Sequence, residues 1–124
     1  MRREFIGMMG KLICEAEELN DLVIVRLSGQ ADVYTSPELS RILEAYLGRG
    51  EINILLDLEK LAYLDSSTLR VLLDLQKKSE AAGGTLKLLK LQGPPLKVFQ
   101  MSGFLQLFQT FQDQEEAEES FRKE

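Results

Sequence analysis

The sequence contains no histidine and a single cysteine among its 124 residues. The absence of histidine excludes a Ser-His-Asp triad, a Cys-His pair and a mixed Cys/His zinc site, and it removes the usual general base near neutral pH. The single cysteine, Cys14, has only Lys11 as a basic neighbour in sequence, so we interpret it as a small packing residue. The sequence therefore predicts no catalytic residues, no metal and no cofactor, and it disfavours hydrolases and metalloenzymes.

Positive charge is also scarce, because 15 Lys and Arg stand against 20 Asp and Glu, for a formal net charge of −5. This balance argues against a protein that binds the phosphate backbone of nucleic acids. Six acidic and two basic residues lie in the segment 113–124, so the rest of the chain is close to neutral. We interpret the acidic end as the solvated face of a helix rather than as an interaction tail.

Long apolar runs are missing as well. The apolar stretch near the start extends only from Phe5 to Gly10 before Lys11 interrupts it, which is short for a signal peptide. No window of the sequence approaches the length of a membrane span. We therefore expect a cytoplasmic protein with no membrane partner, in which residues 1–10 are a poorly ordered extension and residues 11–124 are one domain.

The apolar pattern predicts an α/β domain in which strands and helices alternate. Residues 12–16 and 22–27 flank the pair Asn20-Asp21, which is typical of a hairpin. A first helix should begin at Ser36, which can cap free amides, with Pro37 in the first helical position. The later predicted elements are a strand over 52–58, a helix from 66 to 82, a strand over 85–91, a helix over 95–102, a strand over 107–111 and a helix from 113 onward. Such alternation builds a mostly parallel sheet with an antiparallel N-terminal hairpin strand and about four helices.

Two polar loops follow strands of this predicted sheet, one with Asp32 and one with Asp65 and Ser66. Loops that follow parallel strands emerge at the same edge of a sheet, so we expect the two loops to be neighbours. Ser66 lies where a helix begins and offers unpaired amides and a partial positive charge. The residues there suit plain helix capping, and they also suit an anion such as a phosphate.

Four segments resemble those of one known family, in the same order and spacing: Ser28–Asp32 with Thr35, Tyr63–Leu69, Ala82–Gly84 and Val98–Phe108. The first resembles a Gly-Glu-Leu-Asp-x-x-Thr segment and the second an Asp-Ser-Ser-Gly-Leu motif. Over nearly its whole length the chain is similar to the STAS domain, and within that family to the bacterial anti-sigma factor antagonists. It differs from the usual family pattern at Thr68, where Gly is usual, and at Arg70, where a small residue is common.

The resemblance implies a partner switch that is controlled by serine phosphorylation. Ser66, with Ser67 as second choice, would be phosphorylated by an ATP-binding anti-sigma factor that is itself a serine kinase, and a phosphatase would reset the phosphoserine. The contact residues for this partner would be Asp32, Thr35, Asp65, Ser66, Ser67, Thr68 and Leu69. Unmodified protein would bind the anti-sigma factor and so regulate transcription indirectly, whereas phosphorylation would end that complex. The chain would be a substrate and no enzyme, because the kinase supplies ATP and Mg²⁺.

Other functions stay open at this point. The same fold serves as a scaffold without phosphorylation, such as a stressosome component, or as an accessory subunit of lipid-transport ABC systems. It also forms the cytoplasmic end of anion transporters, which the absence of a membrane segment disfavours. A small enzyme or nucleotide-binding protein is a more distant possibility, because Asp and Glu are its only candidate acid-base groups and none is paired at a characteristic spacing.

Overall fold

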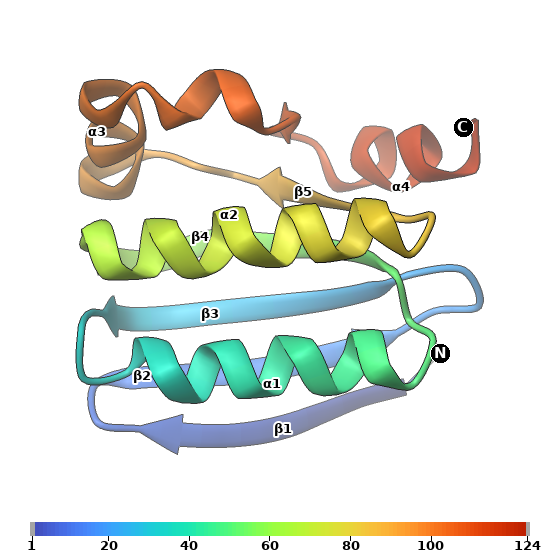
Figure 1. Ribbon diagram of the computed structural model, residues 1–124, viewed down its shortest axis with the longest axis horizontal. Helices are drawn as coiled ribbons and strands as arrows, with labels where there is room; N and C mark the ends of the chain where they lie inside the picture. Colours follow the sequence, from blue (N-terminus) through green and yellow to red (C-terminus); the bar gives the residue numbers. More distant parts are fainter. Residues whose placement is uncertain (1, 124) are drawn as a thin grey trace.

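The computed structural model describes residues 2–123, apart from the side chains of residues 2, 3 and 9, and it forms one six-stranded sheet with helices packed on it (Figure 1). The strands are β1 (Arg2–Met9), β2 (Leu12–Glu18), β3 (Val23–Ala31), β4 (Asn53–Leu64), β5 (Thr85–Leu89) and β6 (Thr110–Phe111). The helices are α1 (Ser36–Gly48), α2 (Ser66–Ala81), α3 (Gly93–Ser102), the 3₁₀ helix η1 (Phe104–Leu107) and α4 (Gln114–Arg122). Within the described residues, none of these helices is long and apolar enough to cross a membrane.

The sheet is antiparallel on its N-terminal side and parallel elsewhere. β1 pairs with β2 and β2 with β3 in antiparallel fashion, whereas β3, β4, β5 and β6 run parallel, so that the strands lie in chain order across the sheet. The chain passes between parallel strands through α1, α2 and α3, as parallel pairing requires a crossover. The predicted α/β domain, with its mostly parallel sheet, antiparallel hairpin strand and four helices, is confirmed.

Helices cover both faces of the sheet. α1 and α2 pack side by side on one face (Figure 1), and the apolar side of α1 has the predicted helical spacing: Leu39, Ile42, Leu43 and Tyr46. α4 covers part of the other face, where Ala117 and Phe121 join a second cluster with Leu55 and Leu89. The first half of β4, residues 54–58, is therefore buried from both sides, as its nearly continuous apolar run predicts.

The first residues of the chain form the edge strand β1, whereas the sequence predicted a poorly ordered extension over residues 1–10. β1 is antiparallel to β2 along its length, and residue 1 lies outside the described residues. Gly10, with φ of 59°, allows the chain to turn back into β2. Ile6 packs against the main core. β2 supplies backbone partners and a surface for Ile6, and such tertiary contacts decide whether a short apolar stretch is a strand.

Three details near helix and strand ends also differ from the expected ones. β4 continues beyond the predicted 52–58 as far as Leu64, and the strand predicted over 107–111 shrinks to Thr110–Phe111 after η1. Ser36 does not cap α1, because Thr35 holds the cap position without a side-chain cap hydrogen bond. The backbone amide of Ser36 instead donates to the carbonyl of Asp32 at 2.8 Å.

Cys14 lies in β2 and is completely buried in the main core. Burial raises the pKa of its thiol to about 12, and the negative charge of Glu15 adds to the shift. Because the thiolate is the nucleophilic form, a thiol with so high a pKa is inert near neutral pH. The interpretation of Cys14 as a packing residue is confirmed.

Gly84 stands immediately before β5, where an added Cβ would lie 2.1 Å from the carbonyl oxygen of Ile52. We expect Gly84→Ala to lower the free energy of unfolding by about 2 to 3 kcal/mol, because the clash is with main chain and no side-chain rotation relieves it. Gly48→Ala is the matched control, since an added Cβ there meets nothing within 4 Å. That variant should be neutral or slightly stabilised, because alanine is the better helix former. Urea unfolding followed by circular dichroism compares the two, and equal stabilities would contradict the expectation.

Candidate functional site

The loops that follow β3 and β4 lie side by side at the carboxyl edge of the parallel strands, as predicted. Ala31 at the end of β3 lies opposite Leu64 at the end of β4, and the amide of Asp65 donates to the carbonyl of Ala31 at 3.2 Å. Both loops are at the end of the sheet where α2 begins (Figure 1). We call the two segments, residues 32–35 and 65–70, the carboxyl rim.

Asp65 caps α2 and joins the two halves of the carboxyl rim. Its Oδ1 accepts hydrogen bonds from the amides of Ser67 (3.1 Å) and Thr68 (3.2 Å) and from the hydroxyl of Ser67 (2.6 Å). Burial raises the pKa of this carboxyl, but hydrogen bonds from Ser67, Thr68 and the amide of Val33 outweigh it and hold the pKa below its ordinary value. Asp65 is therefore an ionised carboxylate that is used to hold its own loops together.

Ser66 and Ser67, the two candidate phosphoacceptors, have different surroundings. Ser66 is the first residue of α2 and is exposed, and within residues 2–123 its hydroxyl makes no hydrogen bond. Ser67 is partly buried, and its hydroxyl donates to Asp65. Ser66 is thus the hydroxyl that a second protein can reach without breaking an existing hydrogen bond.

Asp32 organises the other half of the carboxyl rim. Its Oδ1 accepts hydrogen bonds from the amides of Tyr34 (2.9 Å) and Thr35 (3.1 Å), and its own amide donates to the hydroxyl oxygen of Thr35 at 2.9 Å. This is an Asx-type turn, in which the side chain replaces a backbone acceptor. Asp32 stays partly exposed, so it both shapes the loop and reaches the surface.

Three of the residues that the resemblance offers as partner contacts are buried. Thr35, Thr68 and Leu69 are 3%, 0% and 1% exposed. The hydroxyl of Thr68 lies 3.4 Å from Oδ1 of Asp65, and Leu69 packs in the main core. These side chains support the carboxyl rim from inside, and the predicted contacts that remain accessible are Asp32, Asp65, Ser66 and Ser67.

Large exposed side chains lie within the carboxyl rim and next to it in sequence, and the sequence analysis did not identify them. Val33 and Tyr34 are 57% and 88% exposed, and Tyr63 near the end of β4 is 46% exposed. We call these three residues the apolar patch. One signal was available in the sequence, because large apolar residues directly after Asp32 lie in a loop and serve no core. Exposed aromatic side chains beside hydrogen-bonding groups are typical of protein contact surfaces.

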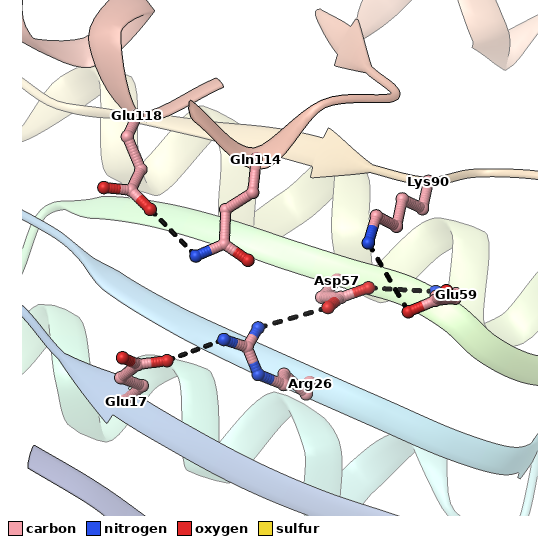
Figure 2. A network of polar contacts seen from close by, with 7 residues as sticks. All are labelled: Glu17, Arg26, Asp57, Glu59, Lys90, Gln114 and Glu118. Carbon is pink, nitrogen blue, oxygen red and sulfur yellow. Dashed lines mark hydrogen bonds and ion pairs between the residues drawn. The ribbon is translucent and has the colours of Figure 1, made fainter. Parts of the chain in front are cut away.

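A second cluster of charged residues lies on the sheet face that α4 partly covers (Figure 2). Arg26 donates to Asp57 at 3.1 Å and to Glu17 at 2.6 Å, and this cluster adjoins a cavity of about 300 Å³. Lys90 pairs with Glu59 at 3.6 Å. The carboxylates of Figure 2 thus already interact with cations or amide groups, and we interpret the Arg26 pairs as a link between β2, β3 and β4. In the part of the chain that the structure describes, no group of acidic or cysteine side chains is arranged to hold a metal ion.

The chain matches known proteins over most of its length. The sequence model of the STAS domain matches residues 14–117. The anti-sigma factor antagonist SpoIIAA in its unphosphorylated form superposes with a TM-score of 0.77 at 26% identity, over 90% of this chain and 97% of that one. The Bacillus cell fate determinant SpoIIAA in the phosphorylated form gives 0.68 at 27% identity, over 86% and 97%. An anti-sigma factor antagonist from Mycobacterium paratuberculosis shares the fold, with 0.80 at 19% identity over 90% and 94%. No curated protein sequence matches the chain significantly.

The Arg26 link can be tested by removing its charge. We expect Arg26→Met to lower the free energy of unfolding by about 2 to 4 kcal/mol near neutral pH, because Glu17 and Asp57, 12% and 10% exposed, lose their cation. An uncharged carboxyl group needs no cation, so the loss should be smaller at acidic pH than at neutral pH.

Arg41→Met serves as the control, since Arg41 pairs with Glu38 at an exposed site of α1 and should cost less than about 1 kcal/mol. Denaturant unfolding at neutral and acidic pH gives both values. A difference between the two variants that does not change with pH would contradict the interpretation.

Proposed function

The chain belongs to the STAS domain family, and we propose that it is an anti-sigma factor antagonist whose partner binding is switched by phosphorylation of Ser66. The observation that carries this proposal is the exposure of Ser66 at the first position of α2, while the neighbouring hydroxyl of Ser67 is bonded to Asp65. SpoIIAA, an antagonist of which unphosphorylated and phosphorylated forms exist, is 26 to 27% identical to this chain and supports the same regulation here.

A phosphate on Ser66 would change the electrostatics of the carboxyl rim at a single point. Phosphoserine carries about −1.5 to −2 charges near neutral pH. It would stand at the positive end of the α2 dipole, which tolerates an anion. A partner that fits the uncharged hydroxyl would lose its hydrogen bond with Ser66 and would meet a dianion beside Asp32 and Asp65. The modification would therefore be compatible with this fold and incompatible with the complex.

The proposed partner is an ATP-binding anti-sigma factor with serine kinase activity. The γ-phosphoryl group of ATP would pass to the Ser66 hydroxyl oxygen, which loses its proton, and ADP would leave from the kinase. A phosphatase would hydrolyse the phosphoserine and restore binding. This chain would be the phosphoacceptor rather than the catalyst, it would act in the cytoplasm where ATP is available, and it would regulate transcription without touching nucleic acid.

The surface proposed for the partner combines the accessible rim residues with the apolar patch. Val33 and Tyr34 project from the same loop that Asp32 organises, and the amide of Val33 contacts Asp65 beside Ser66. Exposed tyrosine rings such as that of Tyr34 contribute much of the binding energy at protein interfaces, and the charged groups around them set the specificity.

Phosphorylation is tested by incubating the chain with its anti-sigma kinase, ATP and Mg²⁺ and measuring the intact mass. We expect an increase of one phosphate that is lost in Ser66→Ala and retained in Ser67→Ala, because Ser66 is exposed whereas the hydroxyl of Ser67 is bonded to Asp65. Ser66→Asp should weaken partner binding about 10-fold, less than the phosphate does, since a carboxylate carries less charge. Phosphate on Ser67 would overturn the assignment of the site. No modification, together with stable membership of a larger assembly, would favour the scaffold function.

The docking surface is tested by Tyr34→Ala. We expect the affinity of the unphosphorylated chain for its partner to fall about 10- to 100-fold. The substitution removes the contact area of a side chain that is 88% exposed in the free protein. Stability should not change. Phe5→Ala is the matched control, since Phe5 is 62% exposed on β1 and lies outside the carboxyl rim. Calorimetric titration measures the partner affinity of both variants. An equal loss of affinity in the two would contradict the proposed surface.

A further inference from the structure

Arg70 is an exposed cation one helical turn after Ser66, and within residues 2–123 its side chain has no ion pair and no hydrogen bond. The other arginines whose side chains the structure describes are all paired with acids: Arg26, Arg41, Arg49 and Arg122. The acidic residue one turn further along α2, Asp74, is occupied by Lys78 at 3.1 Å. Among the arginines whose side chains are described, Arg70 is thus the one without an ionic partner.

The helix brings Arg70 and Ser66 onto the same face. Residues four positions apart are neighbours on a helix surface, with their Cβ atoms about 6 Å apart. The Cα–Cβ bonds of a helix tilt toward its N-terminus, so a long side chain at position 70 can reach back over the first turn. An anion that precedes a cation by four residues is also the more favourable order on a helix. A phosphate on Ser66 would lie within reach of the guanidinium.

We propose that Arg70 changes its contacts when Ser66 is phosphorylated, an inference that rests on the proposed phosphorylation of Ser66. In the unmodified protein Arg70 offers its charge to the docked partner. A phosphate on Ser66 accepts a bidentate, charge-assisted pair of hydrogen bonds from the guanidinium across one turn of α2. Modification therefore adds a dianion to the carboxyl rim and withdraws a cation from it in the same event.

The surrounding negative charges explain why a phosphate on Ser66 needs a nearby cation. Asp65 precedes the phosphate directly, and its carboxylate is tied down by the amides of Ser67 and Thr68. Asp32, on the adjoining loop, is held in the same way by the amides of Tyr34 and Thr35. Neither acid can turn away from a new negative charge, and Arg70 is the only basic residue in the first ten positions of α2. Its guanidinium offsets the repulsion without any change in backbone.

The capture of the phosphate is tested on full-length chain in which phosphoserine is installed at position 66 by genetic encoding, so no natural kinase is required. Phosphorus NMR follows the second ionisation of the phosphate. We expect its pKa to be about half a unit lower in the Arg70 protein than in Arg70→Gln, with Arg70→Lys in between, because only arginine offers the planar pair of donors. Arg41→Gln is the matched control on α1 and should leave the value unchanged. Equal phosphate pKa values with and without Arg70 would overturn the proposal.

The role of Arg70 in docking is tested with unmodified protein. We expect Arg70→Gln to weaken partner binding about 5- to 10-fold. Binding should also depend less on salt concentration, because one charge of the carboxyl rim has gone. Unchanged affinity would overturn this half of the proposal. The outcome is independent of whether the kinase uses Ser66: failure of the kinase to modify Ser66 would count against the proposed function, while the phosphorus NMR result would still report on Arg70.

Discussion

The carboxylate of Asp65 is the contact on which the candidate site depends. It accepts from two amides at the start of α2 and from the hydroxyl of Ser67, and the amide of Val33 reaches it from the other loop. One ionised group thereby caps a helix, joins two loops that are about thirty residues apart in sequence, and occupies the hydroxyl next to the candidate phosphoacceptor. Ser66 is exposed, and Asp65 leaves its hydroxyl available while it engages that of Ser67.

The two faces of the sheet are covered by different kinds of side chains, apolar on one and partly charged on the other. Under α1 and α2 the face is apolar almost throughout, and it holds the main core. On the opposite face α4 covers only part of the strands, and beyond it the side chains become charged, with Arg26 bonded between Asp57 and Glu17. Lys87 is fully buried beside α4, where its ammonium donates to Ser120 at 2.9 Å and lies 4.5 Å from the ring centre of Phe121. Polar contacts hold this side where apolar area is limited.

This division separates stability from function. The core and the Arg26 link secure the sheet, so the carboxyl rim can carry exposed rings and an arginine that has no ion pair among the described residues. These side chains contribute little to folding. Such residues are expected where a partner supplies the missing contacts. A change of charge at Ser66 would then act on the partner and on Arg70, while the Asp65 cap keeps the loops in place.

The sequence by itself determined the order of helices and strands from β2 onward, the meeting of the loops after β3 and β4, and the place of Ser66 at a helix start. Those features follow from apolar periodicity, turn residues and the rule that parallel strands end at one edge, which are all local or topological. Only the tertiary structure decided that residues 2–9 are a strand, that Lys87 is buried, that Thr35, Thr68 and Leu69 face inward, and that Ser67 is bonded while Ser66 is free to be reached. The reason is physical: Arg26 meets Asp57 across 31 positions and Lys87 meets Ser120 across 33, and no local pattern records contacts between residues so far apart.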